Sequence, residues 1–228
     1  MIPSGYNNRE WTVVEREIDG VRMMYVPAGC FRAVSDSAEA TVETCVDAFW
    51  LGQTEVTNAQ YAACVEAGKC SPPAPLNSAS RSNYYDDPDF ADFPVIHVTW
   101  EQANDYAQWR QMRLPRLDEW RYAVEGPSNW IYPWGGSAPD NQLLNFNNVV
   151  GDTMMVGSYP AGATWVGTLD MAGNVWEWTS DASDGNRIVC GGAWDSYQGL
   201  VQATYIGSNA PAASGDSIGF RVATSAQN

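Results

Sequence analysis

The stretch 169–181, Leu-Asp-Met-Ala-Gly-Asn-Val-Trp-Glu-Trp-Thr-Ser-Asp, constrains the fold of this chain more than any other. In an extended backbone, alternate side chains point to opposite faces, so Trp176 and Trp178 share one face and Glu177 lies on the other. Gly173, just before them, marks a turn with accessible backbone carbonyls. The segment thus combines an aromatic anchor with oxygen donors that suit a hard cation such as calcium. A tight turn capped by its own polar groups is the simpler alternative.

The composition limits the class of protein. The chain has 228 residues, of which 45% are hydrophobic, enough for one substantial core or two small ones. No stretch approaches the roughly 20 apolar residues of a membrane span, and the first ten residues lack the basic run and apolar core of a signal peptide. The formal charge of −15 argues against nucleic acid as a partner, because phosphate binding needs clustered lysine and arginine.

His97 is the single histidine of the chain. That count excludes a zinc or iron site built from several histidines and leaves one candidate for histidine acid–base chemistry. Its apolar neighbours, Ile96 and Val98, favour a buried structural histidine.

The five cysteines fit no metal knuckle or redox motif of the C-x-x-C type. Cys30 and Cys45 fall on consecutive expected strands across a polar loop, and Cys64 and Cys70 flank a helix end. We expect the bridges Cys30–Cys45 and Cys64–Cys70, with Cys190 free; for the first pair, two unbridged buried thiols are the alternative. Such bridges indicate a protein that works outside a reducing cytosol.

Two helices carry the same start signal. A threonine followed three residues later by glutamine is a capping box, and it occurs at Thr57 and again at Thr99. A third short helix is expected to begin after Pro115 and to end at Gly126.

Strands are expected towards both ends of the chain. Asp19-Gly20 between two apolar runs indicates a hairpin. The expected strands span residues 11–15, 21–29, 45–51, 187–194 and 218–223.

Segment 195–217 has a different character from the rest. It has no periodicity, no charge beyond two aspartates, and many small polar residues with two tyrosines. Antibody binding loops have a similar amino-acid composition, in which tyrosine supplies contact area and serine, glycine and asparagine supply adaptable hydrogen bonds. An ordinary long surface loop is the alternative, although loops of this length in compact domains tend to be functional.

A set of ordered motifs resembles the formylglycine-generating-enzyme, or sulfatase-modifying-factor, domain family. The motifs are Met24-Tyr-Val-Pro-Ala-Gly-Cys-Phe, Phe49-Trp-Leu-Gly-Gln-Thr-Glu-Val-Thr-Asn, Pro94-Val-Ile-His-Val-Thr-Trp, Arg113-Leu-Pro, Tyr132-Pro-Trp-Gly, Asp170-Met-Ala-Gly-Asn-Val-Trp-Glu-Trp, Gly191-Gly-Ala-Trp and Ile218-Gly-Phe-Arg. The resemblance covers nearly the whole chain. It implies one domain over residues 1–228 with an α+β, C-type-lectin-like fold, in which short helices pack on small antiparallel sheets with much irregular loop.

The resemblance also implies a structural calcium ion. Its ligands would be side-chain oxygens of Asp170 and Glu177 and the carbonyls of Gly173 and Val175. One departure concerns the third helix, where Arg116 stands in place of the small capping residue that the family usually has, so we expect a weaker helix cap.

A second departure concerns catalysis. The oxidising members of the family carry two cysteines after Gly-Gly-x-Trp that bind copper, and Ser196 and Val201 occupy those positions here. Neither side chain supplies a thiolate. We therefore expect no copper and no formylglycine formation, hence no enzyme of this kind. Ergothioneine-type oxidative members use several histidines, which this chain lacks.

A third branch of the family fits better. Segment 195–217 resembles the hypervariable region of diversity-generating-retroelement variable proteins, which display a binding surface on phage or cell exteriors. The resemblance implies a non-catalytic protein whose region 191–221 binds a protein or other macromolecule. Its expected contact residues are Asp195, Ser196, Tyr197, Gly199, Thr204, Tyr205, Gly207, Ser208, Asn209, Asp216 and Ser217. The alternative is a non-catalytic or uncharacterised sulfatase-modifying-factor domain of a bacterial secreted or surface protein.

Overall fold

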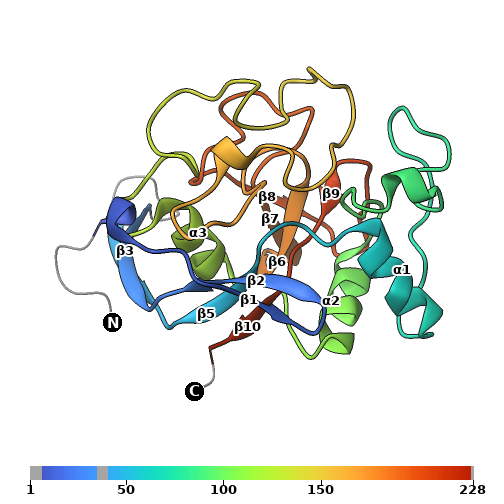
Figure 1. The fold of residues 1–228 in the computed structure, drawn as a ribbon, viewed down its shortest axis with the longest axis horizontal. Coiled ribbons are helices and arrows are strands. Elements are labelled where there is room, and N and C mark those ends of the chain that lie inside the picture. Colours follow the sequence, from blue (N-terminus) through green and yellow to red (C-terminus); the bar gives the residue numbers. More distant parts are fainter. Residues whose placement is uncertain (1–6, 35–40, 227–228) are drawn as a thin grey trace.

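The computed structural model describes residues 7–34 and 41–226, and it has the α+β architecture that the sequence predicts. Short helices and small sheets are joined by long irregular loops (Figure 1). Three short 3-10 helices, Asn8–Glu10, Pro88–Phe90 and Pro160–Gly162, lie within those loops. The polar loop expected between the first two cysteines falls mostly at residues 35–40, outside the described residues.

The first sheet contains strands from both ends of the chain. Its order is β1-β2-β5-β10, with β1 at Glu15–Ile18, β2 at Val21–Val26, β5 at Phe49–Gly52 and β10 at Ala223–Ser225. The predicted hairpin is present: Asp19 and Gly20 have positive φ values of 48° and 75°, as the tight turn between two antiparallel strands requires. The strand expected at residues 11–15 begins only at Glu15.

The second sheet is a two-stranded ribbon of β3 (Gly29–Val34) and β4 (Thr41–Val46). The antiparallel register places Cys30 directly opposite Cys45, and the two form a disulfide. The second predicted bridge, Cys64–Cys70, is also present, and Cys190 is free and buried. All three expectations about the cysteines are therefore confirmed.

The three helices begin and end close to where the sequence places them. They are α1 at Asn58–Glu66, α2 at Trp100–Trp109 and α3 at Leu117–Glu125. Both predicted capping boxes form, because Thr57 and Thr99 each accept a hydrogen bond from the glutamine amide three residues on, and each glutamine side chain accepts one in return.

The N-terminus of α3 receives its cap from a distant segment. The side chain of Arg116 makes no cap hydrogen bond, as expected, but the backbone N–H of Leu117 donates to the carboxylate of Asp181 at 2.8 Å. The carboxylate of Glu119 accepts from the backbone N–H of Arg116 at 2.9 Å. Two carboxylates thus satisfy the exposed amides of the first turn.

The third sheet has the order β8-β7-β6-β9, with β6 at Trp176–Ser183, β7 at Asn186–Cys190, β8 at Ile206–Asn209 and β9 at Ile218–Gly219. Two expectations need correction here. Strands β6 and β9 are parallel, so the sheets are not purely antiparallel. Strand β8 lies inside segment 195–217, which shows no strand periodicity because β8 is a short edge strand with half its residues exposed.

The predicted closing strand at 218–223 is two strands in two different sheets. The chain leaves β9 in the third sheet and enters β10 in the first, and Phe220 and Arg221 between them are fully buried. The sequence does not mark the break, because Phe220, Arg221 and Val222 between the two strands include no proline or glycine turn signal. This crossing joins the two sheets at the centre of the molecule (Figure 1).

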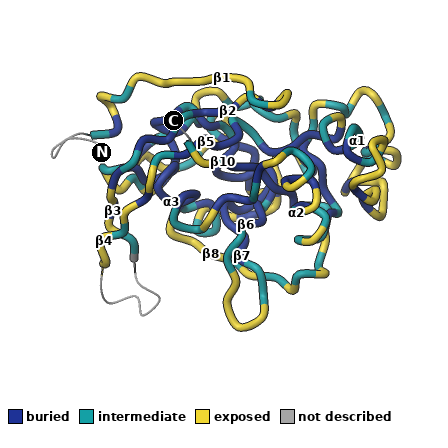
Figure 2. The backbone as a smooth tube through the Cα atoms, turned by 90° about the horizontal axis from the view of Figure 1, so that it is seen from below, coloured by how far each residue is buried: buried dark blue, intermediate teal, exposed yellow. Residues whose placement is uncertain are grey.

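The core lies on both faces of β6, where buried backbone runs through the middle of the molecule (Figure 2). The predicted alternation is present: Trp178 is fully buried in one hydrophobic cluster with Tyr61 and Phe220, whereas Glu177 faces Trp120 in the other cluster. Among the described residues, no helix is long and apolar enough to cross a membrane.

Candidate ligand-binding face

A buried ion pair supports the frame under segment 195–217. The guanidinium of Arg221 contacts the carboxylate of Glu177 at 2.6 Å and 2.7 Å, and neither side chain is exposed. Trp120 donates its indole N–H to the same carboxylate at 2.8 Å. Arg221 also donates to the backbone carbonyls of Gly52, Gln53 and Leu169. Every donor and acceptor of this buried pair is thus engaged, as burial of charge requires.

One expected calcium ligand, Glu177, belongs to this pair, and Asp170 lies close enough for its charge to act on Arg221. Asp170 has a positive φ of 56° and accepts a hydrogen bond from the backbone N–H of Gly157 at 2.6 Å. Gly173 has a φ of 75°, and a side chain there would collide with the carbonyl of Asn145. Both oxygens of Glu177 are already bonded to Arg221 and Trp120.

Glu55 is a neighbour that the sequence reasoning missed. Its carboxylate is buried; Oε1 accepts from Asn174 at 2.9 Å, and Oε2 has no hydrogen-bond partner among the described residues. Burial, reinforced by the charge of Asp170, raises the pKa of Glu55 well above its ordinary value. Little in the sequence indicates this, because Glu55 stands beside the polar residues Gln53 and Thr54.

These donors fit a hard cation only in part. Glu55, Asp170 and Glu177 bring three buried carboxyl groups near the guanidinium of Arg221, and burial raises the pKa of both Glu55 and Asp170. Oxygen donors are the ligands that calcium takes. However, no three acidic, histidine or cysteine side chains among the described residues converge closely enough to hold a metal by themselves. A cation there depends on backbone carbonyls, such as those predicted at Gly173 and Val175.

Segment 195–217 exposes five of its eleven expected contact residues to solvent. Asp195, Thr204 and Ser208 are exposed, and the side chains of Tyr197 and Tyr205 are 62% and 40% exposed. The remaining residues of the expected set are half-buried, namely Gly199, Gly207, Asn209, Asp216 and Ser217.

Ser196 is the exception and corrects the expected set. Its side chain is only 3% exposed, and its hydroxyl accepts a hydrogen bond from the backbone N–H of Ala193 at 2.9 Å. It therefore closes a turn from the inside instead of facing a ligand. A serine between Asp195 and Tyr197 gives no sign of this, because a loop has no fixed side-chain alternation.

The two exposed tyrosines rest on parts of the frame. A Cβ atom at Gly199 would lie 2.9 Å from the ring of Tyr197, so the ring packs close to the backbone of Gly199. Tyr205 packs on Trp176 with ring centroids 5.9 Å apart. Trp176 is itself half-buried, so it contributes to this face as well as to the core, a role that its position beside Trp178 did not reveal.

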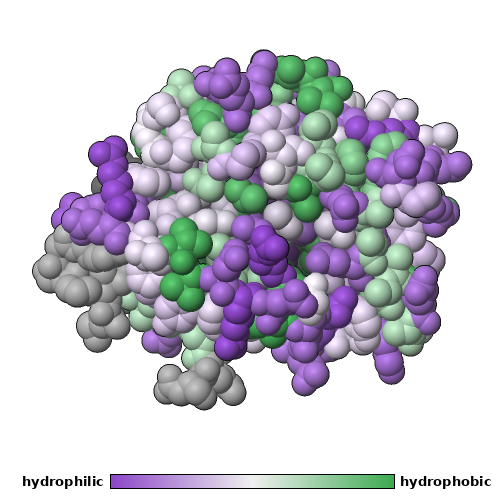
Figure 3. All heavy atoms as spheres, in the orientation of Figure 1, coloured by the Kyte–Doolittle hydropathy of each residue, from purple (hydrophilic) through white to green (hydrophobic). Residues whose placement is uncertain are grey.

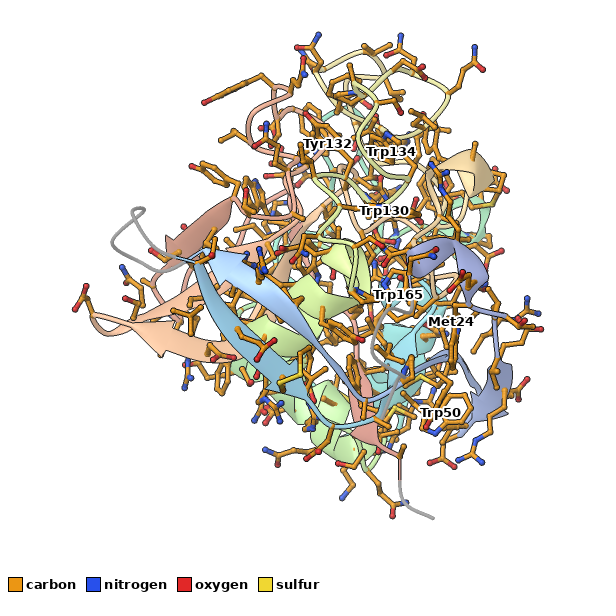
Figure 4. The ribbon with its side chains drawn as sticks, turned by 90° about the vertical axis from the view of Figure 1, so that its left-hand side faces the viewer. Met24, Trp50, Trp130, Tyr132, Trp134 and Trp165 are labelled. Carbon is orange, nitrogen blue, oxygen red and sulfur yellow. A yellow bond between two sulfur atoms is a disulfide. The ribbon has the colours of Figure 1, made fainter. Side chains whose placement is uncertain are left out.

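Two loops outside the segment support it through backbone hydrogen bonds. The backbone N–H groups of Asn147 and Asn148 donate to the carbonyls of Ser196 and Trp194, and Ala203 donates to the carbonyl of Ile131. Next to Ile131, the rings of Tyr132 and Trp134 stack with centroids 5.2 Å apart, side by side in the upper loops (Figure 4).

His97 supports the far end of the segment. Its backbone N–H donates to the carbonyl of Gly215 at 2.9 Å, and the residue is half-buried with a positive φ of 56°. Burial lowers the pKa of its imidazole. The structural role predicted for this histidine agrees with its place, although it is less buried than expected.

The sequence from residue 10 to residue 226 matches the model of the sulfatase-modifying factor enzyme 1-like domain. The chain belongs to this family. An inactive C-alpha-formylglycine-generating enzyme 2 from Bos taurus is 33% identical over 155 residues, covering 59% of this chain and 51% of the relative. A hercynine oxygenase from Mycolicibacterium thermoresistibile is 35% identical over 160 residues, covering 59% and 36%. The chain thus spans about half, or less, of the length of these curated relatives.

Solved structures of the same fold include two that cover nearly the whole chain. PvdO from Pseudomonas aeruginosa has a TM-score of 0.76 at 21% identity, covering 94% of this chain and 98% of its own. Treponema denticola variable protein 1 has a TM-score of 0.70 at 18% identity, covering 93% and 98%. At such identities the likeness concerns the fold, and the expected C-type-lectin-like, formylglycine-generating-enzyme type of fold is confirmed.

In this member of the sulfatase-modifying factor family, both positions of the oxidase cysteine pair are filled and buried. Ser196 is held by Ala193, and Val201 is 1% exposed in a hydrophobic cluster with Tyr132 and Phe146. Cys190, the remaining free thiol, is fully buried, and burial raises its pKa far above the ordinary value. A buried thiol of high pKa is neither a good nucleophile nor a good metal ligand at neutral pH.

The charged groups that line a cavity beside α3 already have structural partners. This cavity, of about 280 Å³, lies between the β3–β4 ribbon and α3 and is bordered by Ile206 of β8. Arg116 pairs with Asp118 at 2.9 Å, and Asp181 caps α3.

Proposed function

We propose that this chain is a non-catalytic ligand-binding protein whose segment 195–217 displays the contact surface. One observation carries the proposal: the segment is held at both ends by buried residues while several side chains between them, including Asp195, Tyr197 and Tyr205, face solvent. Trp194 is 9% exposed and donates its indole N–H to the carbonyl of Asp216 at 3.2 Å, which ties the two ends together. Such a frame lets surface residues change at little cost to stability, usually within about 0.5 kcal/mol.

The names of two similar proteins support this proposal. The Treponema denticola neighbour is named a variable protein, and the bovine relative is named inactive. We infer from the first that segment 195–217 varies between related proteins, and from the second that loss of catalysis is compatible with this domain. The expected partner is a protein or other macromolecule at a phage or cell surface.

There are two alternative functions. In the first, the chain is a non-catalytic or uncharacterised domain of a bacterial secreted or surface protein. In the second, the chain is part of an oxygenase, an alternative that the similarity to hercynine oxygenase favours. The single histidine of this chain opposes the second alternative, since a multi-histidine metal site would need ligands from elsewhere.

The decisive experiment is a capture assay with wild-type protein and the Tyr197→Ala/Tyr205→Ala variant on extract of the target cells. We expect the captured partner to be lost or its affinity to fall at least about tenfold, because exposed tyrosines commonly dominate such surfaces. Val42→Ala/Leu76→Ala is the matched control, since these two exposed apolar residues lie outside the segment. Equal capture by a folded tyrosine variant would show that the binding face lies elsewhere.

A further inference from the structure

Loop 147–150 lies against the candidate segment on either side of Asp195. The backbone N–H of Asn147 donates to the carbonyl of Ser196 at 2.9 Å, and that of Asn148 donates to the carbonyl of Trp194 at 2.8 Å. These two bonds bracket Asp195, so the loop and the segment form one continuous surface at this point. The loop lies outside the region in which the sequence places ligand contacts.

The loop exposes two consecutive apolar side chains at this junction. Val149 and Val150 are 55% and 43% exposed, and Tyr197 beside Ser196 is 62% exposed. Asn147 and Asn148 both have left-handed backbone, with φ of 55° and 57°. Hydrophobic atoms gather at the top of the molecule, over the long loops before β6 (Figure 3). Val149, Val150 and Tyr197 thus place three exposed apolar or aromatic side chains on the two segments that these backbone hydrogen bonds join.

The charges at the junction are all negative. Asp195 is exposed, and the backbone carbonyl of Asp216 accepts from Trp194 next to it. Burial is the main reason that the pKa of Asp195 is raised, and the charge of Asp216 adds to it. Residues 141–157 and 191–217 contain no lysine, arginine or histidine, and the basic group next to Asp216 is His97, whose pKa is lowered by burial.

We propose that loop 147–150 is part of the binding surface and that the partner is a protein carrying lysine or arginine beside an apolar side chain. The apolar part of the partner would cover Val149, Val150 and Tyr197, and its cation would lie between Asp195 and Asp216. An acidic partner is disfavoured because like charges across an interface repel. The inference rests on the proposed function and names the chemistry of its partner.

A phage-displayed random peptide library tests this directly. The wild-type protein, with its disulfides intact, is the immobilised target, and the enriched peptides are sequenced. We expect them to combine lysine or arginine with an aliphatic or aromatic residue. The best peptide is then synthesised, and its affinity is measured for wild type, Val149→Ser/Val150→Ser and Asp195→Asn.

Each variant is expected to weaken binding at least about tenfold, and a rise from about 50 to about 500 mM NaCl is expected to weaken it at least about fivefold, since salt screens the ion pairs. Val13→Ser/Val14→Ser is the matched control, because these adjacent valines have similar exposures of 48% and 43% but lie beside β2. That control is expected to bind like wild type.

Three results would overturn the inference: no enrichment, enrichment of acidic or neutral peptides, or wild-type affinity in the Val149→Ser/Val150→Ser variant. The proposed function is tested separately with Tyr197→Ala/Tyr205→Ala and the same peptide. If only the tyrosine variant loses binding, the proposed function stands and loop 147–150 is not part of the binding surface. If neither the tyrosine variant nor the valine variant loses binding, both the proposed function and the role of loop 147–150 are wrong.

Discussion

The guanidinium of Arg221 donates two hydrogen bonds to the carboxylate of Glu177, a residue 44 positions earlier in the chain. Both side chains are fully buried, and the remaining donors of Arg221 reach the carbonyls of Gly52, Gln53 and Leu169. One side chain therefore joins the end of β5, the turn before β6 and β6 itself. This arrangement holds the frame on which segment 195–217 is displayed.

Removing the cation of this pair is expected to be costly. Arg221→Met leaves the carboxylate of Glu177 buried without its charge partner, which we expect to lower the free energy of unfolding by about 3–5 kcal/mol. Arg221→Lys should restore only part of this free energy, because the lysine ammonium lacks the planar guanidinium that bonds both oxygens of the Glu177 carboxylate. Urea unfolding followed by tryptophan fluorescence measures the difference. A loss below about 1 kcal/mol for Arg221→Met would contradict this account.

Calcium binding is expected to be revealed at Asp170. Asp170→Asn should lower the melting temperature in the presence of calcium and change it less in chelator, because a ligand stabilises only the state that binds it. Glu177→Gln should destabilise the protein in both conditions, since Arg221 already engages that carboxylate. Differential scanning calorimetry with calcium or EDTA distinguishes the two variants. An unchanged wild-type melting temperature on adding calcium would rule out the site.

The two disulfides are expected to differ in reactivity. Cys30 and Cys45 are exposed, whereas Cys64 is fully buried and Cys70 is 8% exposed. Thiol–disulfide exchange needs access of a thiolate to sulfur, so graded dithiothreitol should open Cys30–Cys45 first. Alkylation followed by peptide mass spectrometry identifies the order, and Cys190 should stay unmodified until the protein unfolds. Earlier labelling of Cys64 would show that exposure does not decide the order.

Asp152 is expected to make stability depend on acid pH. Burial by itself raises the pKa of Asp152, but hydrogen bonds from Ser78, Ser80 and the Thr153 backbone outweigh it, and the pKa lies below its ordinary value of 3.8. A depressed pKa means that the folded state prefers the charged carboxylate. The stabilisation is therefore complete above the ordinary pKa and is lost as pH falls through the lower, folded value.

The corresponding variant is Asp152→Asn. It should lose about 2 kcal/mol at pH 7, because hydrogen bonds to a charged group and the contact with Arg81 at 3.2 Å are weakened. The difference from wild type should shrink as pH falls below the folded pKa. Unfolding curves at pH 7 and at the lowest pH where both proteins fold provide the comparison. A difference that is independent of pH would show that the charge is unimportant.

Copper is expected to bring no oxidase activity. Incubation with copper, a reductant and a cysteine-containing sulfatase peptide should give no formylglycine by mass spectrometry, since Ser196 and Val201 replace the two thiols and are buried. An active formylglycine-generating enzyme under the same conditions is the positive control. Copper-dependent turnover by this chain would refute the non-catalytic interpretation.

Local patterns in the sequence determined the elements whose hydrogen bonds close within a few residues. The capping boxes at Thr57 and Thr99, the hairpin turn at Asp19-Gly20 and the alternation along β6 are of this kind, and all are present. The spacing of Cys64 and Cys70 and the ordered motifs of the family belong with them. In each case the residue and its partner are near neighbours, or the motif is long enough to identify the fold.

Only the tertiary structure decided the features whose partners are far apart in the chain. Asp181 caps α3, Arg221 pairs with Glu177, and residues 218–223 divide between two sheets. The tertiary structure also buries the side chain of Ser196 and leaves Trp176 half-exposed. The sequence suggested a solvent-facing Ser196 and a buried Trp176. The physical reason is the same throughout. A carboxylate can accept a hydrogen bond from any donor that folding brings within hydrogen-bonding distance, and the direction of a loop side chain depends on the hydrogen bonds of its backbone. Neither outcome can therefore be predicted from the neighbouring residues in the sequence.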